Sequence, residues 1–170
     1  MRWYWIDRYT EFVRGKRATA IKNVTLSEDH LHDHFPFYPI MPVSLIVEGV
    51  AQTGGLLVCE YHEFRQKVVL AKLNKAAFYF DVHPGDMLTY SVVVDDISEK
   101  GAQISAMSHV GDRLHGEFQM MFAHVEGDLA KREFYRLRDY RHMLNNLGAY
   151  DIGVDENGVR ILEPEVLRNA

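Results

Sequence analysis

From residue 45 to residue 59 almost every side chain is apolar or small, and the apolar positions fall on all sides of a helix instead of along one stripe. Ser44 is a suitable N-cap, so we predict a helix over residues 45–60. A helix that is apolar on every face is normally buried inside a protein. Because the run is short and is interrupted by Glu48 and Gln52, we do not expect it to span a membrane.

Runs of strand-forming residues, separated by turn signals, account for most of the chain up to residue 125. A loop over residues 27–42 joins the first two runs to the predicted helix, and its three prolines exclude regular helix. We therefore expect an α+β fold in which an antiparallel sheet wraps around one long buried central helix. The predicted strands cover residues 8–14, 17–26, 68–80, 87–97, 103–110 and 114–125.

The C-terminal part of the chain, residues 127–170, differs in character from what precedes it. Apolar residues recur at helical spacing over residues 128–147, and Gly148 follows as a stop signal. Asn157-Gly158 lies between short apolar runs, which is typical of a hairpin. We expect residues 1–126 to form the main domain. The C-terminal extension should pack onto it as an extra helix and a short hairpin, since no linker rich in proline, glycine or serine separates them.

Composition narrows the class of protein. A hydrophobic content of 47% over 170 residues suits a compact domain with its own core, and the net charge of -5 argues against nucleic acid as a partner. The single cysteine excludes an intrachain disulfide and fits a reducing compartment. Charged residues within the first ten positions leave no apolar stretch of the kind found in a signal peptide. We therefore expect a cytoplasmic protein without a membrane partner.

Two residues stand out as candidates for acid–base chemistry. Glu48 is the only charged residue in the apolar run of residues 45–59, and His34 lies in the proline-rich loop before it. A buried carboxyl group is costly unless it is paired or neutral. A glutamate kept partly protonated can donate a proton, while a neutral histidine can accept one. Gln52 lies one helical turn after Glu48, on the same face, and is placed to orient the carboxyl group.

The residues around this pair carry a family resemblance. The segments HFP at 34–36, PIMP at 39–42 and LIVEGVAQ at 45–52 resemble the signature of the 3-hydroxyacyl-acyl-carrier-protein dehydratases of the FabZ and FabA type, which is approximately GHFPGxPxMPGxLxxEAxAQ. The spacing matches without a gap. The Pro-Gly-Asp turn at 84–86 also resembles the family, and the likeness covers about residues 3–125. The resemblance implies a hotdog fold and the dehydration of 3-hydroxyacyl thioesters in fatty-acid or related acyl biosynthesis.

The resemblance also implies a role for each site residue. His34 corresponds to the catalytic histidine that removes a proton from C2 of the thioester. Glu48 corresponds to the carboxyl group that protonates the departing C3 hydroxyl. In the family the two residues come from different subunits, so a homodimer or a multiple of dimers is implied. The substrate is an acyl thioester carried on acyl carrier protein, and neither a metal nor an organic cofactor is required.

The remaining implied residues position and enclose the substrate. The backbone N–H near Val43, at the start of the helix, would polarise the thioester carbonyl, and Gln52 would orient the carboxyl group. Phe35, Phe37 and Met41 would line the substrate tunnel.

Three positions depart from the family pattern, because Asp33, Phe37 and Val43 replace its glycines. These replacements remove the permissive residues from the loop backbone. We expect Val43 to keep a negative φ, since Pro42 already directs the chain into the helix. Its side chain, with Phe37 beside it, would then narrow the acyl entrance and favour short or unusual substrates.

Other interpretations stay open at this stage. Glu48 and His34 could be structural residues, and the protein could be a hotdog acyl thioesterase or a non-catalytic acyl-binding module. His30, His32 and His34 alternate along the chain and would share one face if extended, as in a zinc or nickel site.

Two further features have more ordinary interpretations. Gly54-Gly55 is expected to let strands approach the helix closely, and a phosphate-binding role is less favoured because no strand precedes the pair. Basic residues on the tail helix form either a solvated face or a patch for docking a carrier protein. These basic residues are Lys131, Arg132, Arg136, Arg138 and Arg141.

Overall fold

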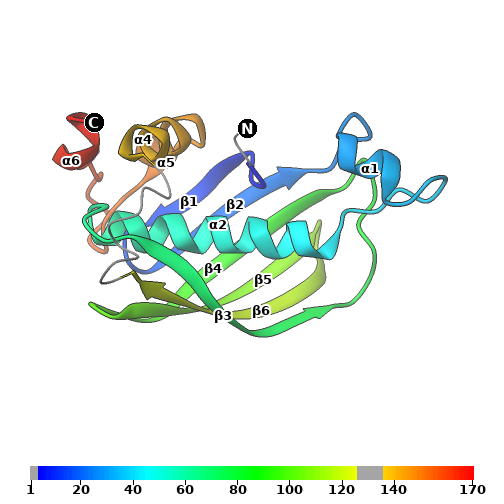
Figure 1. The fold of residues 1–170 in the computed structure, drawn as a ribbon, viewed down its shortest axis with the longest axis horizontal. Coiled ribbons are helices and arrows are strands. Elements are labelled where there is room, and N and C mark those ends of the chain that lie inside the picture. The colour runs from blue at the N-terminus through cyan, green and yellow to red at the C-terminus, as the bar shows by residue number, and fades with distance from the viewer. Residues whose placement is uncertain (1–3, 126–135) are drawn as a thin grey trace.

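The computed structural model describes residues 4–125 and 136–170. One six-stranded antiparallel sheet, in the order β1-β2-β4-β5-β6-β3, wraps around the long helix α2 (Figure 1). This confirms the expected α+β hotdog arrangement. The strands are β1 Arg8–Val13, β2 Arg17–Asn23, β3 Val68–Phe78, β4 Met87–Ser98, β5 Gly101–Val110 and β6 Arg113–His124. The helices are α1 Asp29–Asp33, α2 Val43–Tyr61, α4 Leu137–Asn146, α5 Ala149–Ile152 and α6 Glu165–Arg168.

Helix α2 is the core of the domain, as its apolar sequence predicts. Gly49 and Gly54 let the sheet approach it closely: an added Cβ would lie 2.7 Å from a ring carbon of Tyr90 at the first position and 2.5 Å from the Ile104 side chain at the second. Ordinary contacts between carbon atoms are 3.5–4.0 Å, so any larger residue would push the sheet away. At Gly55 an added Cβ would lie 3.3 Å from a ring carbon of Phe122, so both residues of the Gly54-Gly55 pair support the packing interpretation.

The start of α2 differs from the prediction. The helix begins at Val43 with Pro42 as its N-cap residue, and no side chain caps it. Ser44 is therefore inside the first turn and is not the cap. The physical reason is that proline has a fixed φ suited to a helix start and needs no N–H partner there.

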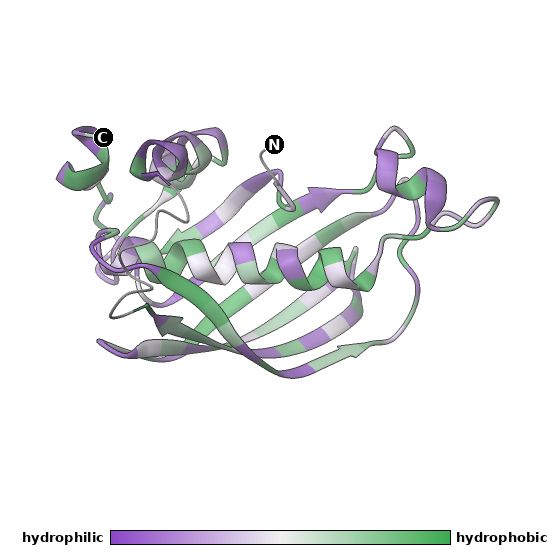
Figure 2. Ribbon diagram, viewed as in Figure 1, coloured by the Kyte–Doolittle hydropathy of each residue, from purple (hydrophilic) through white to green (hydrophobic). Residues whose placement is uncertain are grey.

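By length and apolar composition alone, the 19-residue α2 could cross a membrane, contrary to the sequence-based expectation. Most of the helix is nevertheless buried inside the protein, where its apolar residues face the sheet. Figure 2 shows α2 largely in the hydrophobic colour, interrupted by polar bands, with the sheet beneath it. The apolar composition is thus accounted for by the core.

The proline-rich loop also departs from the prediction of irregular structure throughout. Residues Asp29–Asp33 form the short helix α1, with Leu31 buried beneath it. Proline disrupts a helix that would run into it and disfavours the helical conformation of the residue before it, and the first proline of the loop is Pro36, three residues after the end of α1. The residues upstream of this proline were free to form one helical turn.

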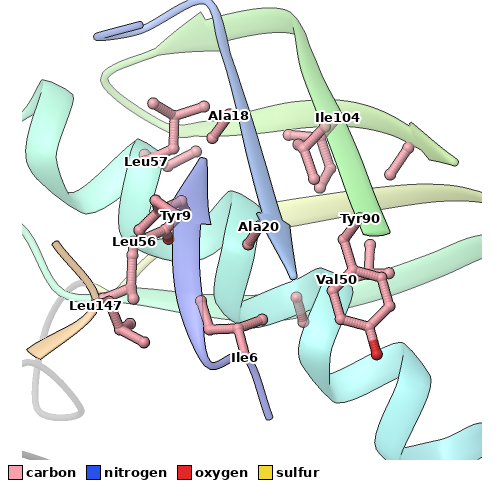
Figure 3. Packing of buried hydrophobic residues seen from close by; sticks show 14 of the residues in the cluster. Ile6, Tyr9, Ala18, Ala20, Val50, Leu56, Leu57, Tyr90, Ile104 and Leu147 are labelled. Atoms are coloured by element: carbon pink, nitrogen blue, oxygen red, sulfur yellow. The ribbon is translucent and has the colours of Figure 1, made fainter. Parts of the chain in front are cut away.

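The C-terminal extension contacts the main sheet and α2. The predicted tail helix over 128–147 is described only from α4 onward, and Phe134 lies outside the described residues. Leu144 and Leu147 are buried in the same core cluster as α2 and β1. Figure 3 shows Leu147 beside Leu56 and Tyr9. In place of a full hairpin, a single antiparallel bridge joins Val154 to Arg160 around the predicted turn.

The two edges of the sheet are treated differently. Along β1, the carbonyl of Leu147 accepts a hydrogen bond from the Tyr9 N–H (2.9 Å), and Val154 bonds to the backbone of Phe12 and of Arg14 (both 2.9 Å). The extension therefore covers the β1 edge. Strand β3, at the other edge, is exposed along most of its length. An uncovered edge strand is a template for pairing with another chain.

Replacing Leu144 by alanine tests whether α4 is part of the core. Its side chain is fully buried, so we expect the free energy of unfolding to fall by roughly 2–5 kcal/mol. His142→Ala, on the exposed side of the same helix, is the matched control and should change it by less than about 0.5 kcal/mol. Urea denaturation followed by fluorescence gives both values. Equal effects of the two variants would show that α4 does not pack on the domain.

Candidate active site

Glu48 lies half-buried on α2 and is held in place by a short chain of hydrogen bonds. The Gln52 Nε2 donates to Oε1 of Glu48 over 3.0 Å. The backbone N–H of Trp5 donates in turn to Oε1 of Gln52 over 2.9 Å. The first bond is the one that the helical spacing predicts. The second fixes which way the Gln52 amide faces, so the carboxyl group accepts its bond from a donor of defined orientation.

Glu48 and Gln52 lie in the wall of a cavity of about 260 Å³, which we call the Glu48 cavity. One face of α2 forms a side of this cavity, as far along the helix as Cys59. Val68 and Leu70 of β3 contribute another side. Except for Glu48, no acidic or basic side chain lines it within the described residues. The cavity thus combines one carboxyl group with a mostly apolar interior, which is typical of a small-molecule site.

His34 lies just after α1, in the loop that leads to α2. Its ring stacks on that of Phe35, with the ring centroids 4.2 Å apart. The backbone of Phe35 and that of Tyr38 exchange two hydrogen bonds of 3.0 Å, so the chain turns tightly between them. The His34 carbonyl accepts from the Ile40 N–H over 2.9 Å. The backbone beside the histidine is therefore held by local hydrogen bonds.

The same loop is attached to the segment that precedes β4. The Met41 N–H donates to the Val82 carbonyl over 2.8 Å, and the His83 ring nitrogen Nδ1 lies 3.1 Å from the Pro39 carbonyl oxygen. The Tyr38 hydroxyl donates to Asp81 over 3.3 Å. These contacts join the loop to residues 81–83, which directly precede the Pro-Gly-Asp turn at 84–86.

The replaced glycines behave differently from one another. Phe37 has φ of 68°, in the left-handed region that favours glycine, and its side chain is fully exposed. Val43 instead takes a helical conformation as the first residue of α2 and has no positive φ. The negative φ expected for Val43 is confirmed, but Phe37 and Val43 line different hollows. A glycine at residue 37 would adopt the positive φ without strain. A glycine at residue 43 would only leave more room at the start of the helix.

The structure does not bring all the predicted site residues together in one chain. Within the described residues no hydrogen bond, ion pair or ring contact joins His34 to Glu48, and no residue of the 27–42 loop lines the Glu48 cavity. Phe35 and Phe37 line a separate outer hollow. Met41 is buried beside Val43 in a third cavity, at the start of α2.

The alternating histidines do not form the face required for a metal site. His30 and His32 lie within α1, where successive side chains are about 100° apart, so they point in different directions. His30 packs edge-on against Trp5, and the ring nitrogen Nε2 of His32 lies 3.0 Å from the Leu26 carbonyl oxygen. The part of the chain that the structure describes contains no cluster of three histidine, cysteine or acidic residues.

A second carboxyl group on α2 was not anticipated. Glu60 is fully buried near the end of the helix, and its Oε2 lies 3.3 Å from Nε of Arg14. Burial raises the pKa of Glu60 to about 7, while Arg14 opposes the rise and Glu63 adds to it. The sequence offered no signal for this, because Arg14 is 46 residues away along the chain. Glu60 is not in the wall of the Glu48 cavity.

Of the five basic residues singled out in the tail, Arg136 and Arg138 are exposed. Lys131 and Arg132 lie outside the described residues. Arg141 forms a partly buried ion pair with Glu163, with 2.8 Å between Nε and Oε1. This arginine stabilises the extension and is not part of a free basic face.

Comparison with known proteins identifies relatives of the N-terminal part of the chain, which holds the sheet and α2. The family model described as a FabA-like domain matches residues 3–113. A 3-hydroxyacyl-(acyl-carrier-protein) dehydratase FabZ of Clostridioides difficile is 40% identical over 122 residues, which are 71% of this chain and 86% of the relative. A protein of the same name from Koribacter versatilis is 44% identical over 111 residues, covering 64% of this chain and 71% of the relative.

Solved structures support the fold. A conserved protein of Pseudomonas aeruginosa superposes with a TM-score of 0.57 at 19% sequence identity, covering 69% of this chain and 87% of that one. At this identity the likeness concerns the fold only.

The buried Glu60 should make stability depend on pH. Because its pKa is raised to about 7, the folded state binds a proton more tightly than the unfolded state does. Stability from this group is therefore present at low pH and is lost as pH rises towards 7. We expect Glu60→Gln to gain stability relative to the original protein as pH rises from about 5 to about 7, because glutamine stays neutral whereas the buried glutamate ionises.

Chemical denaturation at several pH values measures this difference. Glu11→Gln, which removes an exposed carboxylate paired with Arg17 over 2.8 Å, is the control and should show no such trend. A Glu60→Gln variant whose relative stability is flat with pH would contradict the assignment.

Proposed function

This chain belongs to the FabA-like family, and we propose that it dehydrates 3-hydroxyacyl thioesters on acyl carrier protein, giving trans-2-enoyl thioesters for fatty-acid biosynthesis. The observation that carries the proposal is the placement of Glu48. Its carboxyl group is oriented by Gln52 and lines an apolar cavity, within the motif shared with the family. A positioned carboxyl group beside space for an acyl chain is what the elimination of water requires.

The reaction is an acid–base elimination. His34 removes a proton from C2 of the thioester, and the electrons of that C–H bond form the C2–C3 double bond. The C3–O bond breaks, and Glu48 donates its proton to the departing hydroxyl, which leaves as water. Exchange with solvent then returns Glu48 to the acid form and His34 to the neutral base. Gln52 acts as a positioning residue, since it bonds the carboxyl group and not the substrate.

The start of α2 supplies the third part of the site. The first N–H groups of a helix have no partners within the helix and carry partial positive charge. Here Val43 begins the helix and no side chain caps it. We assign the Val43 N–H to the thioester carbonyl, where it would stabilise the negative charge that develops when C2 loses its proton. Phe35, Phe37 and Met41 are also proposed for the substrate tunnel, although within one chain they line two other hollows and not the Glu48 cavity.

A second copy of the chain completes the site in this proposal. Strand β3 is the uncovered edge of the sheet, and Leu70 and Leu73 are exposed there by 40% and 41%. Leu70 also lines the Glu48 cavity. A copy paired along β3 would therefore lie next to that cavity and could bring its own His34 to Glu48. This accounts for the separation of the two residues within one chain.

The proposal also includes the cellular compartment and the carrier of the substrate. Cys59 is a free, buried cysteine, and the relatives named above act on substrates carried by a protein. We place the activity in the cytosol, with acyl carrier protein as the partner that delivers the thioester. The division into a main domain of residues 1–126 and an extension of residues 127–170 is part of the proposal.

Substituting the acid and the base tests the chemistry. His34→Ala and Glu48→Gln should each slow hydration of a crotonyl thioester and dehydration of the 3-hydroxy thioester by about a hundredfold or more, since each removes one half of the proton transfer. The absorbance of the enoyl thioester reports both directions, and a thiol reagent reports hydrolysis. Rates near the original in either variant, or release of thiol in place of enoyl product, would refute the dehydratase.

Mixing the two inactive variants tests whether the site spans two chains. A mixed dimer of His34→Ala and Glu48→Gln chains would contain one intact site if the residues come from different subunits. Random exchange should then restore about a quarter of the original activity. If both residues belonged to one chain, every site would carry a substitution and no activity would return. Mixing each variant with itself is the control.

The open edge should control the oligomeric state. We expect light scattering to show at least a dimer at micromolar concentration, and Leu73→Asp on β3 to shift it towards monomer because a charge is placed in the pairing edge. Val93→Asp is the matched control: Val93 is 51% exposed but lies on β4, inside the sheet. A monomeric original protein, or equal dissociation of both variants, would contradict pairing along β3.

A further inference from the structure

Helix α4 contributes to the Glu48 cavity, although it belongs to the C-terminal extension. Tyr140 and Met143 line the same cavity as Glu48 and Gln52. We call these two α4 side chains the α4 wall. Figure 1 shows α4 near the end of α2 that is opposite α1 and the proline-rich loop.

The α4 wall is anchored from several sides. Tyr140 packs against Phe64 with the ring centroids 5.2 Å apart, and its side chain hydrogen-bonds the buried Cys59 thiol. Next to Met143, Leu144 is fully buried. The ion pair between Arg141 and Glu163 fixes the outer side of the helix. A wall held in this way cannot yield to a ligand without loss of core contacts.

The wall lies beyond the part of the chain that matches the family. The FabA-like match ends at residue 113, whereas α4 begins at Leu137. The extension therefore adds a boundary to a cavity whose other walls, on α2, β3 and β6, belong to the shared fold or lie next to it. Any effect of this added boundary on the cavity should therefore be specific to this protein.

The geometry points to the α4 wall as the residue set that limits the length of the acyl chain, an inference that rests on the proposed function. From Glu48 to Cys59 the helix advances eleven residues, or about 16 Å at 1.5 Å per residue. An acyl chain whose C3 lies at Glu48 can follow this apolar face of α2 until it meets Tyr140 and Met143. Chains that end before the wall fit the cavity, and longer chains collide with it.

An acyl chain is favoured as the occupant by the chemistry of the lining. Beyond Glu48 and Gln52 the cavity is bounded by Leu56, Val68 and other apolar or aromatic side chains, with no second charge to bind a polar group within the described residues. Its volume of about 260 Å³ is small for a ligand site. Both features fit the end of a short to medium saturated chain.

Two truncations of the wall test the inference. Saturated 3-hydroxyacyl thioesters of four to sixteen carbons would be compared by kcat/KM and, separately, by calorimetric binding. We expect Met143→Ala and Tyr140→Ala to extend the accepted length, with about a tenfold gain for the first chain that the original protein rejects. Met143→Trp should shorten the accepted length. Thermal melting establishes that each variant is folded.

Matched controls separate the wall from general effects. Met107→Ala makes the same change at an exposed site on β5, and Tyr140→Phe keeps the ring that forms the wall. Both should retain the original length limit. If folded Met143→Ala and Tyr140→Ala also retain it in turnover and in binding, the inference is wrong. If no length is turned over but the binding limit shifts as described, the α4 wall stands and the dehydratase chemistry fails.

Discussion

The burial of α2 is the constraint on which the other features of this structure depend. A nineteen-residue helix that is apolar on every face has no side that water can cover without loss of free energy. The sheet covers one side, and it does so at short range because Gly49 and Gly54 leave room for Tyr90 and Ile104. The rest of the helix surface must also be kept from water. The C-terminal extension packs against part of it, and another part faces the cavity beside the exposed strand β3.

Polar groups on such a helix are acceptable only where they have partners, and the two carboxyl groups of α2 meet this requirement in different ways. Glu48 accepts from Gln52 beside a cavity, so its environment leaves space for a substrate. Glu60 is enclosed completely and has Arg14 as its charged neighbour. Burial raises the pKa of Glu60 to about 7, although this residue does not line the Glu48 cavity. A raised pKa therefore does not by itself mark a ligand site in this protein.

The C-terminal extension has two structural effects: it covers one edge of the sheet, and it forms part of the wall of the Glu48 cavity. By bonding to the backbone of Tyr9, Phe12 and Arg14, it removes β1 as a free edge and leaves β3 as the edge available for pairing. By placing α4 at the end of α2, it also bounds the cavity in which Glu48 lies. A segment outside the family match thus covers one edge of the sheet and forms part of the wall of the Glu48 cavity.

The sequence by itself determined the elements whose cause is local. The apolar run predicted α2, the turn signals separated the strands, and the spacing of four residues between Glu48 and Gln52 predicted their hydrogen bond, because helix geometry alone brings such residues together. The tertiary structure decided what depends on distant residues. The burial of Glu60 against Arg14 and the closure of the cavity by Tyr140 join segments 46 or more residues apart, which no local pattern records.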